Sequence, residues 1–286
     1  MTQTLVVNLL NGLSFAAVLF LLAAGLSVIQ GLMGILNLAH GAFFMVGAYV
    51  GLTLAKWGWS FPLACLCGSL AAALVGLVIE RGFLQRLYKQ ENAQVLLTLG
   101  FVYIIINLIQ WIWGGRPGIP YVPPSLAGSI QIGQITYPVF RLYMIIIGLA
   151  IAVILWWVGE KTRVGAIVRA GTDDKEMIMG MGINLGLVFM SVFFLGAFIA
   201  GFAGSVGVTV LGAYLDVGWD ALFLALAVIV VGGMGSVSGA LLASVLIGII
   251  DSYGKAFFPD FAMFTIYLLF VVVLLVRPAG LMGKKV

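Results

Sequence analysis

Residues that could carry ionic or proton-transfer chemistry are scarce in the apolar parts of this sequence. His40 is the clearest candidate, and it lies within the run Asn37–Gly41. Five other charged residues fall near the ends of apolar stretches or in an interrupted apolar region: Asp216, Asp220, Asp251, Lys255 and Asp260. Ionisable groups are expensive in an apolar environment and usually mark an ion or proton pathway. Their scarcity argues against a carrier that is driven by its own ion gradient.

Two further kinds of chemistry find little support. Cys65 and Cys67 form a C-x-C pair inside an apolar segment, but metal sites need more ligands, so we interpret both as small helix residues and predict no metal or other cofactor. One histidine and scattered carboxylates form no catalytic constellation, so we predict that the protein is not an enzyme. The phosphate-binding pattern G-x-x-x-x-G-K-[S/T] does not occur. If the protein is a transporter that uses ATP, a separate subunit must therefore hydrolyse the ATP.

The composition indicates an integral membrane protein. The chain has 286 residues, of which 63% are hydrophobic and 8% are charged, and its mean hydropathy is +1.20. A soluble domain carries about 25% charged residues because its surface faces water. The net charge of +4 is small and no basic patch stands out, so we expect no nucleic-acid partner.

The pattern of apolar segments predicts an all-α, polytopic bundle of transmembrane helices that forms one domain over residues 1–286. A spanning helix needs about 20 mainly apolar residues to cross roughly 30 Å of hydrocarbon. The regular candidates are Leu5–Ile29, Leu38–Ala55, Phe61–Ile79, Ala93–Trp113, Phe140–Val158, Asn184–Val208 and Phe261–Val276.

The region between the last two candidates is interrupted. Two short apolar runs, Ala221–Val231 and Ala240–Ile250, flank a glycine-rich stretch, whose expected hinge or turn residues are Gly232, Gly233, Gly235 and Gly239. The runs are either two short, tilted spans or half-helices that re-enter from one side. Irregular backbone at membrane depth survives only where protein or a water-filled cavity surrounds it. The sequence therefore predicts about eight or nine membrane segments, some of them short or re-entrant.

The distribution of Lys and Arg predicts the orientation. Ten of the 14 basic residues lie in Arg81–Asn92, in Gly159–Gly182 and after the last apolar segment. These parts are expected in the cytoplasm, which places the C-terminus inside and the N-terminus outside. The longest external connection, residues 114–138, contains five prolines and is expected to be an ordered, irregular cap. This cap either touches a delivery protein or closes the bundle.

Gly196, Ala200 and Gly204 recur at every fourth position, so they share one face of a helix. Small residues at this spacing let helix backbones approach closely in lipid. We therefore predict a tight helix contact here, in preference to direct contact with a substrate.

The most charged stretch of the protein, Glu160–Glu176, lies between two spans within residues 159–183. A short helix here would expose its charges to a cytoplasmic partner and pack Val164, Ile167 and Val168 against the bundle. The alternative is an ordinary solvated loop.

Four motifs at these positions together resemble the LIV-type (branched-chain amino-acid) ABC permease family and its LivH-like subunits. They occur in order along essentially the whole chain: Gly34–Phe43 followed by Gly47–Tyr49, then Thr162–Ala170 with Asp174 and Gly182–Asn184, then Gly232–Ala240, and finally Arg277–Gly283.

The resemblance implies a set of partners and roles. Members of the family pair two permease subunits, identical or homologous, with two cytoplasmic ATP-binding subunits, and receive ligand from a periplasmic substrate-binding protein. By position in the motif, Arg163, Arg169 and Asp174 would couple to the ATPases. Asn37, His40 and Gly41 would lie on the substrate pathway, with Gly41 allowing close backbone approach; the alternative for His40 is a structural hydrogen-bond donor.

The sequence thus predicts a permease subunit of an ABC importer in the bacterial inner membrane, with a branched-chain or related small amino acid as cargo. Other amino acids, urea and short amides stay open as cargo. The alternative function is an ion-coupled secondary transporter or channel for a small polar solute.

Overall fold

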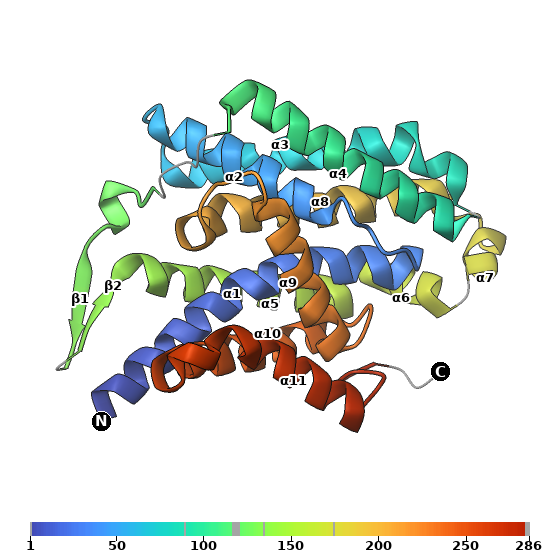
Figure 1. The fold of residues 1–286 in the computed structure, drawn as a ribbon. Coiled ribbons are helices and arrows are strands. Elements are labelled where there is room, and N and C mark those ends of the chain that lie inside the picture. Colours follow the sequence, from blue (N-terminus) through green and yellow to red (C-terminus); the bar gives the residue numbers. More distant parts are fainter. Residues whose placement is uncertain (1, 89, 116–120, 134, 174, 284–286) are drawn as a thin grey trace.

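Figure 1 shows a computed structural model, which describes residues 2–88, 90–115, 121–133, 135–173 and 175–283. Six helices in this part of the chain are long and apolar enough to cross a membrane. They are α1 (Thr2–Met33), α3 (Phe61–Gly82), α4 (Glu91–Trp113), α5 (Val139–Lys161), α8 (Leu185–Leu211) and α10 (Val237–Phe257). The protein is therefore a helical, multi-pass membrane protein.

Three further apolar helices are shorter than a full span. They are α2 (His40–Lys56), α9 (Val217–Gly232) and α11 (Ala262–Val276). The number of membrane segments depends on how these three are counted, so eight or nine segments stays a prediction. The orientation relative to the cytoplasm stays a prediction as well.

One apolar run was predicted too short. The run Ala240–Ile250 is the middle of α10, whose 21 residues are enough to span. Asp251 interrupts the hydropathy pattern, but its carboxylate is buried and lies 2.6 Å from the Lys255 ammonium on the next turn. The helix therefore continues past Asp251, although the hydropathy pattern of the sequence suggests that the apolar segment ends there.

Residues 114–138 contain more regular structure than the irregular cap that we predicted. A single 3₁₀ turn, η2 (Pro124–Leu126), precedes the strands β1 (Ser129–Ile132) and β2 (Ile135–Pro138), which pair antiparallel. This hairpin is a small addition to a chain whose other regular elements, among the described residues, are all helices. Two of the prolines of this connection, at positions 117 and 120, lie outside the described residues.

The centre of the bundle is α8, which packs against α1, α2 and α3. The largest fully buried side chains of the bundle include Leu19 on α1, Phe43 and Phe44 on α2, and Phe193 on α8. The start of α8 is fixed locally, because the side chain of Asn184 accepts a hydrogen bond from the Leu187 amide at 3.2 Å.

Two short helices that are not apolar spans lie in the connection between α5 and α8. These are α6 (Arg163–Asp173) and α7 (Lys175–Gly180). They lie at one end of the bundle, whereas the start of α1 and the β1–β2 hairpin lie at the opposite end (Figure 1). The segment expected to meet ATPases and the cap expected outside are therefore at opposite ends of the molecule.

Candidate translocation pathway and coupling segment

The segment between α1 and α2 is non-helical, and every second residue of it is buried, at Ile35, Asn37 and Ala39. Asn37 and His40 have no exposed surface. The Asn37 side-chain oxygen accepts a hydrogen bond from the Ala39 amide at 3.1 Å, which forms a local turn before α2. The Asn37 Nδ2 atom has no hydrogen-bond partner among the described residues. A buried amide in this state is a polar group that a water molecule or a solute could satisfy.

His40, the first residue of α2, joins α2 to α1. Its Nε2 lies 2.8 Å from the Leu22 carbonyl oxygen, and since a carbonyl only accepts, Nε2 donates the proton. The Nδ1 atom has no hydrogen-bond partner within the described part of the chain. The structure therefore gives His40 a structural contact, and its role on a pathway stays a prediction.

Gly41 lies directly against the start of α9. A Cβ at Gly41 would overlap the carbonyl oxygen of Gly218, so no larger residue fits without moving one of the two helices. The first turns of α2 and α9 thus meet inside the bundle. The sequence did not indicate this contact, because the two glycines are far apart in the chain.

The small-residue face of α8 meets two different helices. A Cβ at Gly196 would lie 2.8 Å from the Gly25 carbonyl oxygen on α1, and one at Gly204 would overlap the Phe44 carbonyl oxygen on α2. Ala200, between them, is fully buried. The geometry is that of close backbone contact between helices.

The glycine-rich stretch forms a tight turn between α9 and α10. Gly233 and Gly235 have φ values of 104° and 76°, which favour glycine. A Cβ at Gly232 would lie 2.5 Å from the Gly239 backbone, so the two helix ends are in contact. The Ser236 hydroxyl accepts a hydrogen bond from the Gly239 amide at 3.0 Å and caps α10.

The C-terminal motif folds back onto this turn. The amides of Leu281 and Met282 donate hydrogen bonds to the carbonyl oxygens of Val231 and Gly232, at 2.8 and 2.9 Å. The third and fourth motifs of the sequence thus form a single structural unit. The pairing is non-local, and the sequence alone did not predict it.

The charged segment after α5 has an exposed charged face. Arg163 is exposed, and the Arg169 guanidinium lies 3.7 Å from the Glu160 carboxylate, with both side chains about half exposed. Asp174, the third predicted coupling residue, lies outside the described residues. The start of α6 packs closely against the end of α5. A Cβ at Gly165 would overlap the Gly159 carbonyl oxygen, so the contact requires glycine at this position.

The prediction that Val164 packs against the bundle is wrong, because this side chain is 59% exposed. Val168 packs against the main core, and Ile167 is half-buried. Three methionines around α7 are exposed: Met177, Met179 and Met181. The sequence analysis missed them because it considered only charged residues as possible contacts of a partner.

Glu80, near the end of α3, is a buried carboxylate that the sequence analysis also missed. Its Oε1 accepts a hydrogen bond from the Tyr88 hydroxyl. Burial, and secondly this carboxylate, raise the pKa of Tyr88, so its hydroxyl stays protonated as a donor. The pair ties the connection after α3 to the bundle, beside a hollow of about 140 Å³ whose lining includes Glu80, Arg81 and Asn184.

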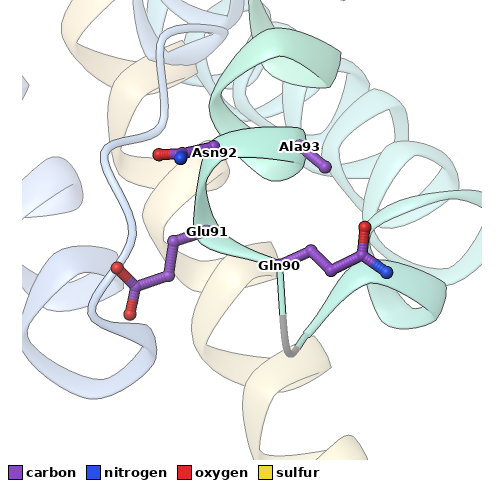
Figure 2. Close-up of a pocket in the computed structure, with 4 residues that line it drawn as sticks. All are labelled: Gln90, Glu91, Asn92 and Ala93. Atoms are coloured by element: carbon purple, nitrogen blue, oxygen red, sulfur yellow. The ribbon is translucent and has the colours of Figure 1, made fainter.

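Figure 2 shows a surface hollow of about 540 Å³ at the start of α4, lined by Gln90, Glu91, Asn92 and Ala93. These are four consecutive residues, and the side chains of Gln90 and Glu91 point away from each other (Figure 2). A binding site needs polar groups that converge from several elements. We therefore assign this hollow no role in transport.

Within the described residues, no group of three His, Cys, Asp or Glu side chains is arranged to hold an ion. Cys65 is buried and Cys67 half-buried, and both are free thiols.

The long apolar helices and the scarcity of charge define a multi-pass membrane protein. The family described as branched-chain amino acid transport system / permease component matches residues 8–274. The chain belongs to this family.

Its relatives cover nearly its full length. The high-affinity branched-chain amino acid transport system permease protein BraD of Pseudomonas aeruginosa is 27% identical over 97% of this chain and 95% of the relative. LivH of Escherichia coli K12 is 26% identical over the same shares of both chains. LivM of Escherichia coli K12, a second permease protein of a system with the same name, is 27% identical over 92% of this chain and 67% of its own length. No solved structure matches the chain.

Proposed function

We propose that this chain forms the translocation pathway for a branched-chain or related small amino acid, as one of two permease subunits of an ABC importer in the bacterial inner membrane. The observation that carries the proposal is the family match along residues 8–274, with relatives that are named as branched-chain amino acid permeases. The absence of a phosphate-binding loop in the sequence fits a subunit that relies on separate ATPases.

The pathway passes close to Asn37, His40 and Gly41 in this proposal. Helices that break inside the membrane commonly build the substrate sites of transporters, because their free backbone groups and polar side chains are available there. The supporting geometry is the break before α2, where Asn37 is buried and its amide nitrogen has no hydrogen-bond partner within the part of the chain that the structure describes. The Asn37→Ala variant is expected to take up substrate more slowly per assembled complex, and the amount of assembled complex is measured because the variant also loses the hydrogen bond from the Ala39 amide.

Coupling to the ATPases is assigned to residues 159–183, with Arg163 and Arg169 as contacts and Asp174 added from its position in the motif. The support is the exposure of the two arginines at the end of the bundle opposite the hairpin (Figure 1). The cap at residues 114–138 would then face the periplasmic binding protein.

Reconstitution in proteoliposomes tests the function. The chain, the second permease, two ATPases and the binding protein from the same genome are combined, and leucine uptake is measured. Uptake is expected to need both ATP and the binding protein. Uptake driven by a proton or sodium gradient without ATP would contradict the proposal and favour an ion-coupled carrier or channel.

A charge reversal tests the coupling segment. Arg163→Glu is expected to remove most of the substrate-stimulated ATP hydrolysis while leaving the thermal stability of the assembly unchanged, because the side chain is exposed. Lys56→Glu, an exposed reversal at the far end of α2, is the matched control and should hydrolyse ATP normally. Normal stimulated hydrolysis in Arg163→Glu removes the coupling assignment.

A further inference from the structure

The first turns of α2 and α9 lie far from the ends of α1 and α8, two of the helices that are long and apolar enough to span the membrane. His40 bonds to Leu22, which is eleven residues before the end of α1, or about 16 Å along the helix. Gly25, next to His40, faces Gly196, which is eleven residues after the start of α8, again about 16 Å. Because Gly218 lies against Gly41, α9 begins at the same depth.

The chain reaches this depth by returning from the far end of α8. About 15 residues, or about 22 Å of helix, separate Gly196 from Leu211 at the end of α8. Residues 212–216 bring the chain back without forming a helix. From there α9 crosses the long helices steeply in the centre of the view (Figure 1), and its 16 residues end beside Gly239.

One face of α9 is exposed, and it begins with two carboxylates at membrane depth. Six exposed or half-exposed positions follow a spacing of four and three residues and form what we call the α9 stripe: Asp216, Asp220, Phe223, Ala227, Val230 and Met234. Three further half-exposed residues, Trp219, Leu224 and Leu226, lie beside this stripe. The opposite face is fully buried against α1, α2 and α10, at Val217, Ala221, Ala225 and Val228. The Tyr214 hydroxyl donates a hydrogen bond to the Asp220 carboxylate.

This face does not suit lipid. A carboxylate facing hydrocarbon is costly, and irregular backbone such as residues 212–216 does not occur where lipid would touch it. The exposed face of α5 is a contrast within the same chain, because Ile146, Leu149 and Val153 are all apolar and lie on an uninterrupted helix. The α5 face suits lipid, whereas the α9 stripe needs water or protein in front of it.

We propose that the α9 stripe forms one wall of the translocation pathway and faces the second permease subunit across it. The inference rests on the proposed function and adds which surface of the chain is involved. LivH and LivM of Escherichia coli K12, two permease proteins named for a transport system of the same name, both match this chain, so the partner that fits is a subunit of the same fold. Subunits of one fold pair about a two-fold axis, which sets equivalent surfaces opposite each other.

Two exposed positions form a matched pair for the test. Phe223 on the stripe is 62% exposed and Ile146 on α5 is 65% exposed. Each is changed to cysteine in a chain with Cys65→Ser and Cys67→Ser, and the assembled complex in membranes is treated with a membrane-impermeant cationic thiosulfonate. A thiol needs water to ionise and react, so Phe223→Cys is expected to react at least about 10-fold faster than Ile146→Cys. Equal, slow rates at both positions would overturn the proposal.

A photo-reactive amino acid at position 223 or 146 identifies the neighbour. Position 223 is expected to cross-link to the second permease subunit, and position 146 to lipid only. Cross-linking of position 223 to lipid only, or of position 146 to the permease, contradicts the proposal. If Phe223→Cys assembles poorly, Val230→Cys on the same stripe replaces it. Neither readout needs ATP or substrate, so a failure of ATP-driven uptake would reject the proposed function and leave this test intact.

Discussion

The face of α8 and the α6–α7 segment meet their neighbours in opposite ways. On α8, Gly196 and Gly204 bring backbones into direct contact, and no charged side chain takes part. On α6, the Arg169–Glu160 pair is half exposed. Helices in a membrane associate through close-fitting shapes. Moving an apolar side chain from lipid into a helix contact gains little free energy, because lipid tails are equally apolar. The bundle is therefore sensitive to volume, and the charged segment is left free to meet a partner.

Gly204→Leu should break the packed region most severely. A side chain at this position overlaps the Phe44 carbonyl oxygen, and backbone cannot yield as a side chain does, so we expect a loss of about 3 kcal/mol or more in the free energy of unfolding. Unfolding in mixed detergent measures it. Gly100→Leu on α4 is the control, because nothing lies within 4 Å of its Cβ position. Equal stability of the two variants would mean that close packing on α8 is unimportant.

His40→Ala should cause the next largest loss. It removes the hydrogen bond to the Leu22 carbonyl and leaves a cavity between α1 and α2, so we expect a loss of about 2 to 3 kcal/mol in the same unfolding assay. Ser191→Ala, which removes only an exposed hydrogen bond within α8, should change stability by less than about 0.5 kcal/mol. A neutral His40→Ala would show that the α1–α2 bond is dispensable.

Ser205→Ala should cause a smaller loss of stability within the packed region. The Ser205 hydroxyl donates a hydrogen bond to the Gly47 carbonyl oxygen on α2 at 2.8 Å. Hydrogen bonds between helices in membranes average about 0.6 kcal/mol, so we expect a loss of about this size in the free energy of unfolding. Ser69→Ala is the matched control, because its hydroxyl donates within α3 to the Cys65 carbonyl oxygen at 2.6 Å. A Ser69→Ala variant that is destabilised as much as Ser205→Ala would remove the distinction between bonds within and between helices.

Arg169→Ala should have the smallest effect on folding. An exposed ion pair contributes little, so the free energy of unfolding should change by less than about 0.5 kcal/mol. The same unfolding assay measures it. A loss above about 1 kcal/mol would place Arg169 among the residues that hold the bundle together, and the contrast between the two regions would fail.

Most of the helices could be predicted because the signal is local. The expected span Ala93–Trp113 differs from α4 by two residues at one end, and Phe61–Ile79 from α3 by three. An uninterrupted apolar run fixes such a helix through its own composition. The run Ala240–Ile250 was underestimated because Asp251 is compensated by Lys255, a pairing that hydropathy does not register.

The candidate site was only partly within reach of the sequence. Its motifs marked Asn37–Gly41 and the glycine-rich stretch, but not that Gly41 meets Gly218 or that Leu281 bonds to Val231. Val164 was misplaced because a helical pattern shows which residues share a face and not which face meets the bundle.

The sequence by itself determined the class of protein, since so few charges cannot coat a soluble surface of this length. It also determined the family, through four motifs in order. Only the tertiary structure decided the depth at which α2 and α9 begin and which side of α9 is left uncovered. Both depend on contacts between residues that are distant in the chain, and such contacts are set by the packing of whole helices.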